Sequence, residues 1–156
     1  MRRRLRLSVQ LALLALIGCA GPQDRAHARG ISVTTSLRSL AARHRGDTLS
    51  IASATVFPWD RCYVFEPYTP SARVAQVVGH GWKDPADVEA RDDINLLVFV
   101  QGDSVIAWEA PKRDLELEMS SDGTCTPSNS LFRVEANTPH GPFTLRRIWF
   151  GKHGAA

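Results

Sequence analysis

One short stretch of the chain, residues 59–68, gathers the side chains best suited to chemistry. Its candidate ligand-binding residues are Trp59, Asp60, Tyr63, Glu66 and Tyr68. Two carboxylates can serve as the acid and the base of glycoside hydrolysis, and aromatic rings can stack on a sugar or a peptide. In the alternative interpretation, the rings belong to the core and the acids cap a turn or pair with Arg61 or Arg73. The sequence does not fix the distance between the carboxylates, so both interpretations stay open.

Two histidines, His80 and His140, stand beside glycine in loop-like sequence. Histidine is the usual general base or metal ligand near neutral pH. The remaining histidines are His27, His44 and His153, and none has a second histidine or cysteine at metal-ligand spacing. The chain also lacks the Gly-x-Ser-x-Gly, His-Glu-x-x-His, phosphate-loop and dinucleotide-binding signatures. We therefore predict no catalytic residues, no metal and no cofactor, and we favour a protein that is not an enzyme.

The amino terminus has the pattern of a secretory signal. Four arginines within the first six residues precede an apolar run, residues 7–17, which Gly18 and Cys19 end. A helix that spans a membrane needs about 20 apolar residues, so this run of roughly a dozen is too short. The junction Leu16-Ile17-Gly18-Cys19 is similar to the lipobox of bacterial lipoproteins.

This resemblance implies a location for the protein. It implies a signal peptide over residues 1–18, cleavage before Cys19, and acyl chains on that cysteine that hold the chain to a membrane; two or more such chains give stable attachment. Residue 20 is Ala20 rather than aspartate, the signal for retention in the inner membrane. We expect the periplasmic face of the outer membrane in a cell with two membranes, and otherwise the outer face of the cytoplasmic membrane.

The net charge argues against a nucleic-acid partner. The whole chain carries a formal charge of +3, from nineteen basic and sixteen acidic residues. Residues 1–18 contain four of the basic residues and none of the acidic ones, so the processed chain carries −1. The basic excess belongs to the signal peptide, and no basic stripe replaces it.

The other two cysteines, Cys62 and Cys125, form an even pair in a chain that we expect outside the cytoplasm. Disulfides persist in such compartments, so we predict a disulfide between them. Closing a loop of about 64 residues would stabilise the fold by about 4 kcal/mol on the chain-entropy model. Two free thiols are the alternative.

Around these residues the sequence predicts a tether over residues 19–33 and a single globular domain over 34–156. A short helix is predicted over 36–45, with Ser36 as its cap and Gly46 after its end. A second is predicted over 70–78, with Thr69 as its cap and Gly79 as its stop. Alternating or β-branched segments predict strands at about 61–66, 96–100, 104–109, 115–119, 131–136 and 143–150.

These elements add up to an α+β domain, a mainly antiparallel sheet of about six strands with two short helices on one face. Residues 96–100 are apolar on both faces, as in a central strand that is covered on two sides. Residues 102–103 suit a tight turn into the next strand. We expect residues 80–95 to form a loop with a helical turn begun by Asp84 and Pro85, and residues 121–129, which include Cys125, to form turns.

Residues 57–110 resemble a group of uncharacterised small exported bacterial proteins. The resemblance rests on Trp59-Asp60, a spaced Tyr63, and Pro67-Tyr68-Thr69-Pro70 before an amphipathic helix. It covers roughly a third of the chain and implies export, and it brings no known activity. The resemblance does not imply the disulfide, because Cys62 is not among the residues that carry it.

Two functions are consistent with these patterns. The first is a non-enzymatic envelope lipoprotein whose domain binds another envelope component, most simply a protein. The second is a hydrolase or ligand-binding domain that acts on cell-wall or glycan material through Asp60 and Glu66.

Overall fold

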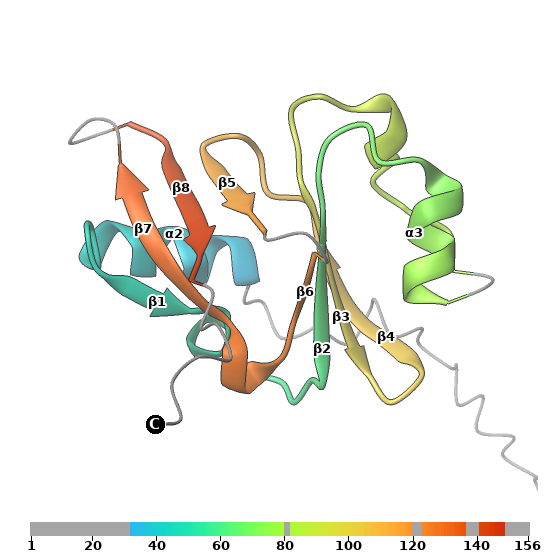
Figure 1. The fold of residues 1–156 in the computed structure, drawn as a ribbon, viewed down its shortest axis with the longest axis horizontal. Coiled ribbons are helices and arrows are strands. Elements are labelled where there is room, and N and C mark those ends of the chain that lie inside the picture. Colours follow the sequence, from blue (N-terminus) through green and yellow to red (C-terminus); the bar gives the residue numbers. More distant parts are fainter. Residues whose placement is uncertain (1–31, 80–81, 120–122, 137–140, 149–156) are drawn as a thin grey trace, which may run out of the picture.

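The computed structural model describes residues 32–79, 82–119, 123–136 and 141–148. Both α-helices lie in the first half of the order of elements, and the second half is mostly strands (Figure 1). The α-helices are α2 (Val33–Arg43) and α3 (Ser71–Val78), and the short 3-10 helices are η1 (Ile51–Ala54), η2 (Val88–Ala90) and η3 (Pro127–Asn129). The strands are β1 (Thr48–Ser50), β2 (Arg61–Phe65), β3 (Leu96–Gln101), β4 (Ser104–Glu109), β5 (Leu115–Glu118), β6 (Thr124–Cys125), β7 (Leu131–Ala136) and β8 (Phe143–Arg147). Neither α-helix of the described residues has the length and apolar content needed to cross a membrane.

The strands form two four-stranded sheets. Sheet A has the order β1-β7-β8-β5 and sheet B the order β4-β3-β2-β6. Every named pairing is antiparallel except that of β5 with β8, which is parallel. The predicted α+β class with mainly antiparallel strands is confirmed, and the strand number of about six is corrected to eight in two sheets.

Helix α2 fills the space beside sheet A. Ser32 caps it by accepting a hydrogen bond from the Thr35 amide, and Val33, Leu37 and Ala41 recur at a spacing of four to form its buried stripe. The helix therefore begins at Val33, earlier than the predicted cap at Ser36. Gly46 follows with φ of 74°, as expected after a helix end.

The larger core lies between α2 and the inner faces of both sheets. We call it the inner cluster; among its buried members are Leu37, Ile51, Trp59, Cys62, Val64, Phe99, Leu115, Cys125, Phe132 and Leu145. Alternation on β5 buries Leu115 and Leu117 and turns Glu116 outward, as predicted. On the outer face of sheet A, Arg146 pairs with Glu118 at 3.0 Å and with Glu135 at 3.2 Å.

A second core, the outer cluster, lies on the other face of sheet B under α3 and residues 82–94. Its buried members are Tyr63, Phe65, Val74, Val88, Ile94, Leu96, Val98 and Val100. Strands β2 and β3 are therefore covered on both faces, which confirms the interpretation of residues 96–100. The two helices serve different clusters, so the prediction that both lie on one face is wrong.

Strand β6 was predicted as turn. Its two residues pair with the middle of β2, Cys62 opposite Cys125 and Tyr63 opposite Thr124. A strand of two residues is too short to show periodicity in the sequence. Its extended conformation depends on its neighbour in the sheet. Strand β1 and helix η1 are also short, and no sequence pattern identified them.

Candidate functional site

Trp59 belongs to the core. It is 5% exposed, and its ring meets Phe99 edge to face at 5.4 Å between centroids. Its indole Nε1 donates a hydrogen bond of 2.9 Å to the Thr55 hydroxyl. The one polar atom of the ring therefore has a partner inside the protein, which agrees with the structural interpretation of this residue.

Asp60 caps the turn between β3 and β4. Its Oδ2 accepts a hydrogen bond of 2.6 Å from the Gly102 amide, and its own amide donates to the Val100 carbonyl at 2.8 Å. The neighbouring Arg61 donates from Nη2 to the Gly102 carbonyl at 2.7 Å. These contacts fasten one end of β2 to the tip of the hairpin.

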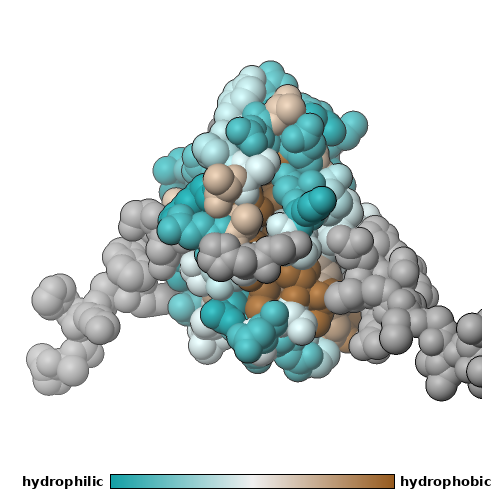
Figure 2. All heavy atoms as spheres, turned by 90° about the vertical axis from the view of Figure 1, so that its right-hand side faces the viewer, coloured by the Kyte–Doolittle hydropathy of each residue, from teal (hydrophilic) through white to brown (hydrophobic). Residues whose placement is uncertain are grey.

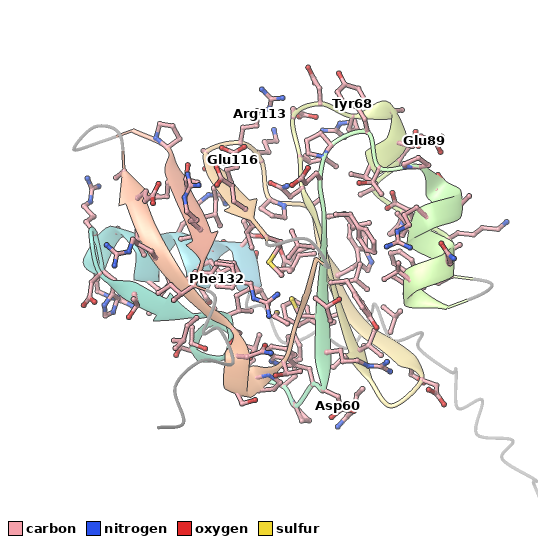
Figure 3. All side chains as sticks on the ribbon, in the orientation of Figure 1. Asp60, Tyr68, Glu89, Arg113, Glu116 and Phe132 are labelled. Carbon is pink, nitrogen blue, oxygen red and sulfur yellow. The ribbon has the colours of Figure 1, made fainter. Side chains whose placement is uncertain are left out.

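Glu66 lies at the other end of β2. Asp60 precedes this strand and Glu66 follows it, and six steps along an extended chain span about 20 Å. Figure 3 shows Asp60 at the opposite end of the molecule from Tyr68, which follows Glu66. Carboxylate pairs in glycosidases stand about 5–10 Å apart. The structure therefore does not bring Asp60 and Glu66 together as such a pair.

Tyr63 and Tyr68 also separate. Tyr63 is buried in the outer cluster, where it stacks on Phe65 at 6.3 Å. Tyr68 is 62% exposed in the loop between β2 and α3. Of the five candidate ligand-binding residues, two are buried, one caps a turn, and only the neighbours Glu66 and Tyr68 are exposed at a common end.

The backbone at Tyr68 has an uncommon conformation. Its φ is 64°, in the left-handed region that a bulky residue rarely adopts. The Tyr68 amide donates to two carbonyls, those of Val88 at 2.9 Å and Arg91 at 3.2 Å. Residues in such conformations cost about 1–3 kcal/mol, persist when the surroundings impose them, and cluster at binding sites. Sequence reasoning identified Tyr68 as an aromatic ring but missed this conformation, which comes from a contact about twenty residues away.

The segment that holds Tyr68 is acidic. Residues 82–93 contain five acidic and two basic side chains. Asp84 accepts from the Ala86 and Val88 amides, which confirms the turn predicted there. Glu89 accepts from the Ser71 amide at 3.0 Å, and its hydrogen bonding to Ser71 lowers the pKa of this carboxyl. Asp93 pairs with Arg91 at 2.6 Å, and this hydrogen bond lowers the pKa of Asp93.

Four acids around Tyr68 are exposed, namely Glu66, Asp87, Glu89 and Asp92, and of these Glu89 is engaged by the Ser71 amide. Asp87 and Asp92 flank the two residues whose carbonyls bind the Tyr68 amide, so they lie beside it. We call Tyr68 together with Glu66, Asp87 and Asp92 the Tyr68 surface. It combines an exposed aromatic ring with three carboxylates. Two exposed arginines lie at the same end: Arg91, which pairs with Asp93, and Arg113, which donates from Nε to the Asp92 carbonyl at 2.6 Å.

Beside this end, the face formed by α3 and sheet B is less polar. Figure 2 shows hydrophobic side chains at its surface between hydrophilic ones. The half-buried hydrophobic residues packed against the outer cluster here include Val77, Val78, Trp82, Val105 and Trp108. Trp82 and Trp108 are therefore half-buried packing residues.

The two cysteines of the domain face each other across β2 and β6. Cys62 and Cys125 are register partners, both fully buried and both present as free thiols. Burial, followed by the hydrogen bond to Cys125, raises the pKa of the Cys62 thiol well above its usual value, and the nearby Arg147 guanidinium acts in the opposite direction. The predicted partners are thus adjacent.

Of the five histidines, only His44 lies within the described residues. His44 follows α2, 4.0 Å from Asp47. Within the ranges that the structure describes, no group of three or more His, Cys, Asp or Glu side chains could hold a metal ion. Cys19, His27, His80, His140 and His153 lie outside the described residues.

Comparison of the chain with protein-family models, with curated proteins and with solved structures gives no match.

Proposed function

We propose that the protein is an exported lipoprotein, held to the membrane by acyl chains on Cys19, and that its domain is a non-enzymatic module that binds an envelope protein at the Tyr68 surface. The observation that carries the binding proposal is the exposed Tyr68 ring on a backbone fixed by the Val88 and Arg91 carbonyls. The lipobox-like residues 16–19 support the anchor.

The fixed backbone favours binding because it reduces the entropy that an ordered contact costs. Exposed tyrosines are enriched among the residues that dominate protein interfaces. Strain in the folded protein is consistent with the same role, since a residue selected only for stability at φ of 64° would be glycine.

The charges around Tyr68 indicate the chemistry of the partner. Glu66, Asp87 and Asp92 are exposed beside the ring, and complementary potential guides association between proteins. The partner therefore presents an apolar pocket for the ring with lysine or arginine side chains at its rim. Such binding weakens as salt rises, because exposed charges are screened beyond about 10 Å at 0.1 M salt.

The chain between the anchor and the domain limits how far the domain can lie from the membrane. Twelve residues separate Cys19 from Ser32, the first described residue. A chain of that length spans at most about 40 Å when fully extended. The domain would thus meet partners close to the membrane surface.

Site-specific photo-crosslinking in intact cells tests the proposal. A photoreactive phenylalanine at Tyr68 should give an adduct of defined mass, and the same residue at Thr48, exposed on β1 of the other sheet, should not. Reversing Asp87 and Asp92 to lysine should abolish the Tyr68 adduct while circular dichroism stays unchanged. Equal adducts at both positions, or an adduct insensitive to charge reversal, would overturn the binding site.

The anchor needs a separate measurement. Mass spectrometry of the processed chain should find acylated Cys19 at its amino terminus, and Cys19→Ser should release the protein from the membrane fraction. A bare thiol at residue 19, or processing at another bond, would reject the anchor without bearing on the Tyr68 surface.

A further inference from the structure

We infer that Cys62 and Cys125 form a disulfide that clasps β6 to β2, and that this bond closes before β6 docks rather than in the folded protein. The sequence suggests the pairing only by count and compartment, whereas the register of sheet B gives it a place in the fold and an order of events. The bond itself does not depend on the proposed export, and only its formation in cells does.

The register carries the first step. Cys62 and Cys125 are directly opposite in an antiparallel pair. Opposed residues in such pairs have Cα atoms about 4.5–5.5 Å apart, and disulfides join Cα atoms about 4.4–6.8 Å apart. Both side chains point into the inner cluster. The register therefore places the two cysteines within reach of a disulfide without a change in strand pairing.

The position of β6 indicates what the bond would stabilise. Strand β6 has two residues and lies at the edge of sheet B, so few ladder hydrogen bonds hold it. The carbonyl of its Thr124 also accepts a hydrogen bond from Arg147 at the end of β8 in sheet A. A covalent link at Cys125 thus secures the strand that lies between the two sheets.

Burial sets the order of events. Both cysteines are 0% exposed, so a disulfide-bearing oxidant cannot reach either sulfur while β6 is docked. In the unfolded chain, a thiolate of either cysteine attacks a sulfur of the oxidant and releases one thiol. The other cysteine then displaces the second thiol and closes the bond. Two protons leave the cysteines, and the oxidant accepts two electrons and becomes two thiols.

Refolding and oxidation in vitro test both parts, on the full chain with Cys19→Ser so that only two thiols remain. After refolding with a mixture of oxidised and reduced glutathione, mass spectrometry should find the peptides of Cys62 and Cys125 joined. Two free thiols in a refolded chain would overturn the bond.

The rate of oxidation tests the order. The folded, reduced chain should react with oxidised glutathione at least ~100-fold more slowly than the same chain in urea, because reaction must wait for local opening. A matched control places an exposed pair in the same geometry. Thr48→Cys with Arg133→Cys joins register partners that are both exposed, on a background of Cys62→Ala and Cys125→Ala.

The exposed pair should oxidise rapidly in the folded state. Equal rates for the buried and the exposed pair would overturn the proposed order. A pair that is oxidised after refolding but reduced in chain taken from cells would contradict the proposed export and leave the bond intact.

Discussion

Glu109 at the end of β4 accepts a hydrogen bond of 2.7 Å from the hydroxyl of Thr34 in the first turn of α2, across 75 positions of sequence. The same carboxylate accepts from the Ser32 hydroxyl at 2.9 Å and from the Val33 amide at 3.0 Å. A carboxylate at a helix amino terminus satisfies free donors and complements the helix dipole. Glu109 thereby joins sheet B to the helix that packs beside sheet A.

Glu109→Ala should therefore destabilise the domain by about 2 kcal/mol, since three donors lose a charged acceptor. Glu116→Ala, an exposed change on β5, should cost less than about 0.5 kcal/mol. Urea unfolding followed by circular dichroism measures both. Equal costs would contradict the role of the carboxylate at the helix terminus.

Gly123→Ala should cost more than Gly46→Ala, although both glycines have positive φ, 61° and 74°. A Cβ at Gly123 would lie 2.8 Å from the Val64 carbonyl oxygen, and a Cβ at Gly46 would have nothing within 4 Å. We expect about 1 kcal/mol for Gly46→Ala and about 2–4 kcal/mol for Gly123→Ala. Chemical denaturation gives the free energy of unfolding of each variant. The difference between the two measures the effect of the close contact between Gly123 and Val64 of β2.

Acid should weaken the contact between α2 and the loop before β5. The hydrogen bonds from Arg38, at 2.6 and 2.7 Å, lower the pKa of the Asp114 carboxyl. A lowered folded-state pKa contributes stability above the unfolded pKa of about 3.9, and that stability disappears as pH falls through the folded value.

Asp114→Asn should therefore reduce the loss of stability below about pH 4. The effect should be about 0.5 kcal/mol, because both side chains are substantially exposed, Arg38 36% and Asp114 55%. Thermal unfolding from pH 2 to pH 7 measures it, with Asp103→Asn in the β3–β4 turn as the control. An identical pH profile in wild type and Asp114→Asn would argue against this pair.

Tyr68→Gly should separate stability from binding. Glycine adopts positive φ without steric cost, so the variant should be equally stable or more stable by up to about 1 kcal/mol. Its photo-crosslinked complex, formed from a probe at the exposed Ala90 next to Arg91, should nevertheless disappear. A variant less stable by more than about 1 kcal/mol would show that the ring serves the fold.

Asp60 offers a test of the carboxylate hypothesis. Asp60→Asn keeps an acceptor for the Gly102 amide and should leave stability and crosslinking unchanged, whereas Asp60→Ala should cost about 1 kcal/mol. The double variant of Asp60→Asn with Glu66→Gln should fold and retain whatever activity the purified protein has. Loss of a hydrolytic activity in the folded double variant would revive the glycan-directed alternative.

The fold was predictable wherever one segment carries its own pattern. The predicted segments 61–66 and 70–78 closely match β2 and α3. The β-branched and aromatic content between Pro58 and Pro67, and the Pro70–Gly79 boundaries, are local signals. The predicted cap of α3 differs for a long-range reason. The Thr69 hydroxyl donates to the Glu66 carbonyl, and Glu89 accepts from the Ser71 amide instead.

The candidate site was less predictable than the elements around it. Sequence reasoning chose the aromatic and acidic residues of 59–68 as one group, but β2 is extended and its two ends lie far apart. Whether a ring is buried depends on the inner and outer clusters. Each cluster is built from residues that lie far apart in the sequence, so no single segment reveals it. Of these residues, Glu66 and Tyr68 remain exposed together at one end of β2.

The parallel pairing of β5 with β8 has a consequence for the order in which the chain can fold. Strand β5 has β8 as its sole sheet neighbour among the described strands, and β8 is the last of them to be synthesised. Sheet A therefore cannot close until β8 has left the ribosome, because in the order β1-β7-β8-β5 only β8 joins β5 to the other described strands.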